Sequence, residues 1–497
     1  MVNRLITFLK YHYSERIEMP FWYSKKTASM GLLFLFTIVL SISSLTPPFQ
    51  SPDEFNHIKR AYLLSKGKIL LDTKNGLTGG EIDQGLLSYM DRFQDIPFHR
   101  DNKVALSDME LSEKITWTSQ RTFSGFPNTA AYFPLPYMPQ AASLWIGENA
   151  GLSVANSYRM ARLFSLMSSI LILGLALFAF PAPPIVLALV LTPMCLFQLA
   201  SASLDAITTS IFVLCISLFM RGALTSCKFT KGMMNTLSLC IFALATSRLN
   251  LLPLTMLPAI LYLIKRDRSY LVHCGVLVIA SSSWILFALL TVQGMGRDSS
   301  VTNAADLSTA KIISYYIQSP SQFFKVLGTT ITNPNMILNY WKMYIGILGW
   351  LDAPFNIHFY DYFAVLFVVF ALMSVHWKMA LLREPQRIAL AVICIFSIIL
   401  LFFILLVSWS AHPAKVIDGV QGRYFTSCFI MLAYAISDFR PSAFRLRILI
   451  GFLCLSFFSS AYSIPRILLE RYYMQEKNTR VLTIFNEDWG NRIENLR

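Results

Sequence analysis

Long runs of apolar residues dominate the sequence and decide what it can fold into. A helix needs about 20 mostly apolar residues to cross a bilayer, and only 14% of this chain is charged, against about a quarter of an ordinary soluble domain. The chain is therefore predicted to be an all-α polytopic membrane protein, and a soluble globular enzyme is excluded. Eleven runs are candidate spans: 29–46, 160–180, 185–203, 206–220, 233–247, 249–264, 271–293, 362–380, 388–408, 424–438 and 447–463.

Basic residues predict the orientation of these spans. The chain has 42 Lys and Arg against 28 Asp and Glu, and Lys and Arg concentrate in cytoplasmic loops. If residues 135–150 do not cross, four basic clusters fall on the same side as the N-terminal segment 1–28. We therefore interpret 135–150 as an interfacial or re-entrant helix. The positive net charge then reflects the basic cytoplasmic loops, and we expect no nucleic acid partner. The clusters are Arg221/Lys228/Lys231, Lys265/Arg266/Arg268, Lys378/Arg383/Arg387 and Arg440/Arg445/Arg447.

This topology places two long loops on the outer side of a transmembrane domain that covers residues 29–463. The first loop is 47–159 and the second 294–360, and a tail of 464–497 is expected outside as well. Loops of this length are usually functional or disordered. The first is too aromatic for a solvated linker, so we expect small helices lying on the membrane surface.

The sharpest motif is SPDEFNHIKRAY at 51–62, directly after the first predicted helix. Prolines end that helix, and Asp53, Glu54 and His57 open a new one. Adjacent carboxylates at an interface can supply a general base or a cation site. They could equally form an ordinary first helical turn, with Ser51 as the cap and the acids favouring the helix dipole.

Three further polar positions stand at the outer ends of apolar runs. Asp205 is an acid of the kind that is usually functional at such depth, or else it caps the next helix. Trp350 and Asp352 lie in GWLDAPF, which could also be a plain turn. Arg423 and Tyr424 follow two glycines in DGVQGRYF, where an arginine suits a phosphate, although it could also reach lipid headgroups. His57, Trp350, Asp352 and Tyr424 are the candidate substrate-binding residues.

Several common chemistries have no motif here. The sequence lacks GxxxxGK[ST], GxGxxG after a strand, HExxH and GxSxG. Its eight cysteines show no metal-site spacing, so neither zinc nor a disulfide framework is supported.

Five motifs, in the same order over residues 30–430, resemble a bacterial family of multi-spanning membrane proteins of the GT-C glycosyltransferase superfamily. The resemblance implies a GT-C type bundle of about 11 helices, with outward-facing juxtamembrane helices and an acidic motif in the first large loop. The layout is also similar to serotype-converting glucosyltransferases that modify O-antigen. The motifs are PDEFNH (52–57), AYFPLPYMPQAASLWIGENAGL (131–152), PMCLFQLASASLDA (193–206), GILGWLDAPF (346–355) and GVQGRYF (419–425).

The resemblance implies transfer of a sugar from a polyprenyl-phosphate carrier to a cell-surface glycan, with the site facing the periplasm from the bacterial inner membrane. Asp53 and Glu54 look like its catalytic acids, Asp205 like a second acid, and Arg423 like a donor-phosphate ligand. The resemblance fixes no cofactor; if a divalent cation such as Mg²⁺ or Mn²⁺ takes part, Asp53 and Glu54 are the residues expected to hold it. Two other classes stay open: a transporter or flippase for a lipid-linked glycan, and an O-antigen polymerase.

Overall fold

Seven long apolar helices form the body of the protein in a computed structural model, which describes residues 25–224, 227–294, 309–375, 384–439 and 441–474. Within these residues, seven helices are long and apolar enough to cross a membrane. The prediction of a polytopic, mainly helical protein is confirmed. The seven are α2 (Lys25–Leu45), α8 (Val154–Ala179), α11 (Leu204–Ala223), α14 (Ser269–Thr291), α18 (Ile357–Ser374), α19 (Pro385–Ser408) and α21 (Ala443–Tyr472).

The other four expected spans are shorter or divided helices. Proline explains the divisions, because it cannot donate the backbone hydrogen bond of a helix interior: Pro184 and Pro193 each begin a short helix, and Pro253 lies within a 3₁₀ segment. These elements are α9 (Pro184–Val190), α10 (Pro193–Leu199), α12 (Lys231–Ser247), η2 (Leu249–Met256), α13 (Leu257–Lys265), η4 (Gly422–Phe425) and α20 (Thr426–Ile436).

The first long loop contains the expected small helices together with a sheet that was not predicted. The expectation of helix alone is therefore wrong there: three antiparallel strands pair in the order β1-β2-β3, in register Asp72↔Gly79 and Gly79↔Gly125. Asn75-Gly76, both with positive φ, forms the hairpin turn that this dipeptide favours. The elements are α3 (Glu54–Ser65), β1 (Asp72–Lys74), β2 (Leu77–Asp83), α4 (Gln84–Asp91), α5 (Leu106–Glu113), β3 (Arg121–Gly125), α6 (Pro127–Ala130), η1 (Leu135–Tyr137) and α7 (Met138–Asn149).

Helix α7 covers the stretch that decides the topology. Its 12 residues span about 18 Å, too little for a hydrocarbon core of about 30 Å. It lies along α8, with Gly147 against Ser157 and Gln140 donating to Ser165. A Cβ on Gly147 would stand 2.2 Å from the Ser157 hydroxyl, so this glycine allows the close approach.

The second long loop and the C-terminal region complete the described chain. Helix α21 continues to Tyr472 through Pro465, past the boundary expected at 464, because its last turns are held by first-loop residues. The remaining tail, 475–497, lies outside the described residues. The second loop forms α15 (Thr309–Gln318), α16 (Pro320–Ile331), α17 (Pro334–Gly346), β4 (Ile347–Leu348) and β5 (Ala353–Pro354).

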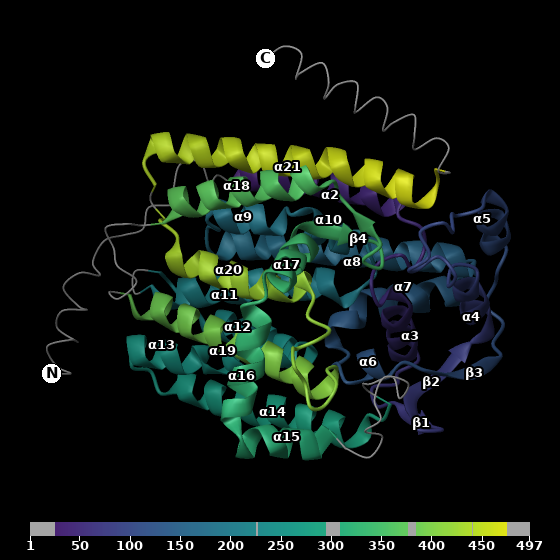
Figure 1. The fold of residues 1–497 in the computed structure, drawn as a ribbon, viewed down its shortest axis with the longest axis horizontal. Helices are drawn as coiled ribbons and strands as arrows, with labels where there is room; N and C mark the ends of the chain where they lie inside the picture. Colours follow the sequence, from purple (N-terminus) through teal and green to yellow (C-terminus); the bar gives the residue numbers. More distant parts are fainter. Residues whose placement is uncertain (1–24, 225–226, 295–308, 376–383, 440, 475–497) are drawn as a thin grey trace, which may run out of the picture.

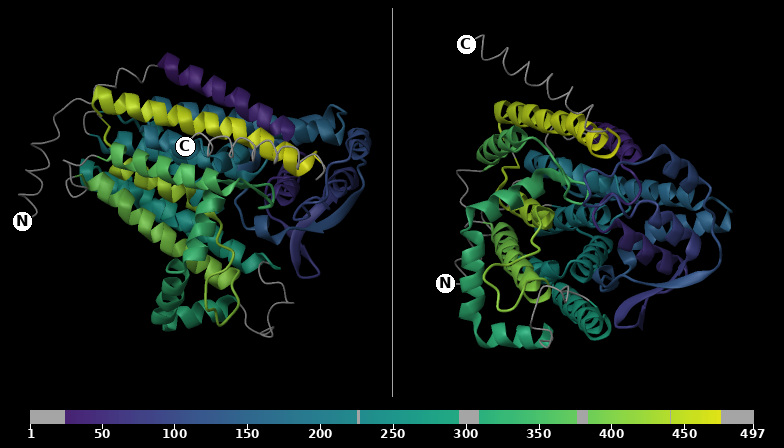
Figure 2. Two further views of the ribbon diagram at one scale, coloured as in Figure 1. Left: turned by 45° about the horizontal axis from the view of Figure 1, so that its top comes forward. Right: turned by 45° about the vertical axis from the view of Figure 1, so that its right-hand side comes forward.

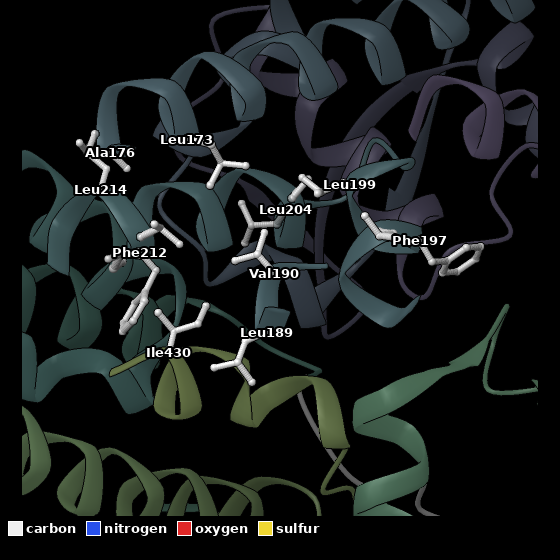
Figure 3. Packing of buried hydrophobic residues seen from close by; sticks show 14 of the residues in the cluster. Leu173, Ala176, Leu189, Val190, Phe197, Leu199, Leu204, Phe212, Leu214 and Ile430 are labelled. Atoms are coloured by element: carbon white, nitrogen blue, oxygen red, sulfur yellow. The ribbon is translucent and has the colours of Figure 1, made fainter. Parts of the chain in front are cut away.

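The core lies between α8, α9, α10, α11 and α20, which contribute buried leucine, valine, phenylalanine and isoleucine side chains to one cluster (Figure 3). Helices α2 and α21 lie side by side along one face (Figure 2). The first-loop elements gather at one end of the bundle (Figure 1). At the other end Arg221 binds the carbonyl of Ala179, and Arg387 binds that of Ser437, so the described basic loops share the end opposite the first loop.

Candidate functional site

The candidate site lies where several helix ends meet at the first-loop end of the bundle (Figure 1). Asp53 precedes α3, Asp205 lies in the first turn of α11, Arg248 follows α12, and Arg423 lies in η4. The structure therefore brings together three of the predicted residues, Asp53, Asp205 and Arg423, and adds Arg248.

Asp53 is held in an unusual backbone conformation at the start of α3. It occupies the N-cap position of α3 with φ 62°, but its side chain makes no capping hydrogen bond. The hydroxyl of Ser51, the cap considered from the sequence, makes none either. Asp and Asn adopt this left-handed region more readily than most residues. The side chain is 36% exposed, and its Oδ2 accepts a hydrogen bond from Nη2 of Arg423 at 2.8 Å.

Glu54 points the other way, into the bundle, and is fully buried. Its two oxygens accept from Arg162 Nε at 3.1 Å and Nη2 at 3.0 Å. They also accept from the backbone N–H groups of Ala202 at 2.8 Å and Ser51 at 3.3 Å. Asp53 and Glu54 thus face different partners and do not form the paired cation site that their adjacency suggests.

Arg162 connects this buried pair to the end of α2. Its Nη1 and Nη2 donate to the carbonyls of Ser43, Thr46 and Pro47 at 2.7–3.2 Å. The carbonyl of Ser43 has no partner within the last turn of α2, and those of Thr46 and Pro47 follow directly after that helix. The Glu54–Arg162 pair therefore fixes the exit of α2 and, with it, the segment that carries Asp53.

A row of alternating charges runs from Asp53 into the bundle. Arg423 bridges Asp53 and Asp205 through Nη2 and Nη1, the second at 3.2 Å. Asp205 also accepts from Gln198 at 2.9 Å and forms an ion pair with Arg248. The Arg423 side chain is only 4% exposed, so it does not reach toward lipid headgroups.

Aromatic side chains surround the two arginines. The Arg248 guanidinium lies 5.9 Å from the ring centre of Tyr132 and 6.0 Å from that of Tyr424, and Arg423 lies 5.5 Å from Tyr424. Such faces attract cations. The site is therefore a charge-balanced row of two arginines and two aspartates, with aromatic walls and one partly exposed carboxylate, Asp53.

The charges shift the titration of both acidic and basic groups. Burial raises the pKa of Asp53, but Arg423, helped by His57 and Arg248, outweighs it, so the pKa lies below its usual value. The stability that this carboxylate contributes is present above its ordinary pKa and is lost as the pH falls through the lowered one. Burial also lowers the pKa of His57 to about 3, against the opposing effect of Asp53. At neutral pH Asp53 is ionised and His57 is neutral, with its Nδ1 2.7 Å from the hydroxyl of Tyr137.

Asp352 and Trp350 belong to a separate cluster that ties α21 to the loops. Asp352 accepts from Arg471 Nη2 at 2.7 Å and from the backbone N–H of Phe98 at 3.2 Å. Trp350 donates to the carbonyl of Phe49 at 2.9 Å. Trp350 therefore supports the segment before Asp53, Asp352 ties α21 to the first loop and to Trp350, and neither has a contact with the charged row among those described.

Arg162, Arg248 and Tyr132 were not among the predicted site residues. A signal for the arginines exists, because each interrupts or borders an apolar run, where an ionisable residue is costly and usually has a partner. The partner itself was not visible, since Glu54 and Arg162 are 108 residues apart. Among the described residues no group of three or more His, Cys, Asp or Glu side chains could hold a metal ion.

The sequence was compared with known families and proteins. Residues 34–432 match the model of the family described as predicted membrane protein (DUF2142). The chain belongs to this family. No curated protein matches the sequence. As a DUF2142 protein the chain is a multi-spanning membrane protein, and the family description names no activity.

Proposed function

We propose that this DUF2142 protein is a glycosyltransferase of the GT-C type. It would transfer a sugar from a polyprenyl-phosphate carrier to a cell-surface glycan such as O-antigen, on the periplasmic side of the inner membrane. The observation that carries the proposal is Asp53: an exposed, ionised carboxylate beside two arginines, at the end of the bundle opposite the basic loops.

The chemistry follows from where the Asp53 oxygens point. Oδ2 is held by Arg423, which leaves Oδ1 for a substrate hydroxyl. Asp53 takes the proton of an acceptor hydroxyl while the oxygen of that hydroxyl attacks the anomeric carbon of the donor sugar. The bond from that carbon to the phosphate oxygen breaks, and polyprenyl phosphate leaves with the electron pair. A single displacement of this kind inverts the anomeric configuration.

The arginines contribute fixed positive charge to this step. Negative charge grows on the leaving phosphate oxygen, and preorganised cations stabilise such a charge without reorganising. Arg423 holds Asp53 in place and lies in the same row as Arg248. His57 of α3 and Tyr137 of η1 contact each other and are both buried, so this neutral pair supports the start of α3 behind Asp53.

The test compares the surface glycan of cells that produce the wild-type protein with that of cells producing Asp53→Asn, by mass spectrometry and linkage analysis. We expect the wild-type cells to carry an additional sugar that the variant cells lack, with the variant equally abundant in the membrane. Full modification by the variant would reject the proposal. A missing sugar accompanied by lipid-linked sugar held on the cytoplasmic side would favour a flippase.

A further inference from the structure

An apolar groove on the bundle has no role in the proposed reaction so far. It has a volume of about 490 Å³, which is the size of a ligand pocket. It runs between η2, α13, α16 and α19, and its lining residues are all apolar. Three of them, Met256, Val392 and Phe396, are 41%, 43% and 59% exposed, so the groove opens on the outer surface of the bundle.

One end of this groove leads to the charged row. Arg248 caps η2, and Pro253, which lines the groove, follows five residues later, about 10 Å along a 3₁₀ helix. On the opposite wall, Phe403 of α19 lines the groove, and the neighbouring Phe402 packs against Phe425 at 5.9 Å. Phe425 directly follows Tyr424, whose ring faces Arg248. On each wall, the residues that line the groove are therefore close in sequence to residues that contact or carry this arginine.

Arg248 is also the more accessible of the two arginines. Its side chain is 22% exposed, against 4% for Arg423. Arg423 uses both Nη atoms on carboxylates, whereas Arg248 is held by Asp205 through Nη2 and has other N–H groups to offer. A guanidinium suits the oxygens of a phosphate, which it can hold by two hydrogen bonds.

We propose that the groove between η2, α16 and α19 binds the hydrocarbon tail of a phosphate-bearing membrane lipid, and that Arg248 binds its phosphate. The choice of a lipid phosphate as occupant rests on the proposed function, and the charge at one end of an otherwise apolar groove supports it. In this proposal the main phosphate contact is Arg248, whereas the sequence resemblance implied Arg423. Arg423 is then the residue that positions Asp53.

The experiment uses a polyprenyl phosphate with a photoreactive group near the end of its tail, added to the full-length protein in nanodiscs. After irradiation, mass spectrometry maps the labelled peptides. We expect label on η2, α16 and α19. Unlabelled polyprenyl phosphate should compete about tenfold or more better than polyprenol, because an ionic hydrogen bond is lost with the phosphate. Inorganic phosphate should not compete.

Matched variants test the two halves of the site. Val392→Trp fills the groove and should reduce labelling about tenfold, whereas Val365→Trp, at an exposed position of α18 outside the groove, should not. Arg248→Gln should remove the preference for phosphate over polyprenol. Thermal unfolding of each variant checks that it is folded, and the competition in the wild-type protein stands without any variant.

Three results would overturn the inference: label spread evenly over lipid-facing helices such as α18, equal competition by polyprenol, or displacement by inorganic phosphate alone. Labelling measures lipid binding and needs no sugar transfer, so the failure of this inference can be distinguished from the failure of the proposed function. Groove labelling without transfer keeps the lipid site and rejects the enzyme. Sugar transfer without groove labelling would keep the proposed enzyme and reject the lipid site.

Discussion

Replacing the neighbouring acids Asp53 and Glu54 one at a time should have different effects: Glu54→Gln should lower stability, and Asp53→Asn should lower activity. Glu54→Gln removes the charge opposite Arg162, whose side chain is 6% exposed, and Glu54 itself is fully buried. Each carboxylate oxygen of Glu54 accepts two hydrogen bonds. In Glu54→Gln one of these oxygens is replaced by an NH₂ group, which cannot accept, so two of the four hydrogen bonds are replaced by contacts between two donors. Breaking a buried ion pair on one side costs about 3–5 kcal/mol.

That cost is a large part of a typical folding free energy of about 5–15 kcal/mol. At about 2 °C per kcal/mol, the melting temperature of Glu54→Gln should fall by roughly 6–10 °C. Asp53→Asn should behave differently. The Asp53 side chain is 36% exposed and its partner Arg423 is buried, but Arg423 keeps its contact with Asp205 and the Asn oxygen can still accept from it. The loss should therefore stay near the ~1 kcal/mol of a partly exposed pair, and Asn tolerates the left-handed backbone. Asp53→Asn should unfold within about 2 °C of the wild type, but lose transfer at least ~100-fold.

The assay is thermal unfolding of the purified protein in detergent together with transfer of a radiolabelled sugar in proteoliposomes. Glu110→Gln and Asp101→Asn, at exposed positions of the first loop, are the matched controls and should match the wild type in both measurements. A stable Glu54→Gln protein with no transfer would refute the assignment of roles, and so would an Asp53→Asn protein with full transfer.

Other predictions test the charges and the orientation. Arg423→Gln should move the acid limb of the pH–rate profile to higher pH, because burial alone would raise the pKa of Asp53; an unmoved limb would show that Asp53 is not the group that titrates. Trp145, 55% exposed on α7, should be quenched by lipids brominated near the headgroup more than by lipids brominated at the chain ends, and the reverse order would place α7 across the membrane. Reporter fusions after Leu71 should read periplasm and those after Arg268 cytoplasm; both on one side would refute the topology.

The apolar runs predicted most of the helices because membrane-spanning helices need only length and composition. The same reasoning overestimated the short runs around Pro193 and Pro253, where proline divides the helix. It missed the three-stranded sheet of the first loop, although Asn75-Gly76 between strand-like residues is a hairpin signal.

The site was predictable residue by residue but not as a set of pairs. Asp53, Asp205 and Arg423 stand out as polar groups at the ends of apolar runs. Their contacts join positions up to 370 residues apart, and no local spacing encodes such a pairing. The sequence therefore identified Asp53, Asp205 and Arg423 one by one, whereas their pairing and the partners Arg162 and Arg248 came from the fold.

The backbone at the start of α3 gives the acid pair its two roles, and Glu54→Asp tests this. Asp53 has a left-handed backbone and precedes α3, whereas Glu54 is the first residue of that helix, and the two side chains reach different arginines, Arg423 and Arg162. Glu54→Asp keeps the charge but withdraws the carboxylate by about 1.5 Å, one carbon–carbon bond. The exit of α2 and Asp53 with it should shift, and a misplacement of about 1 Å can cost ~100-fold in rate. We expect Glu54→Asp to unfold at a higher temperature than Glu54→Gln and to lose kcat with an unchanged KM for the acceptor. Its pH–rate profile should stay that of the wild type, because a positioning residue does not titrate with the reaction; a shifted acid limb would instead make Glu54 the base.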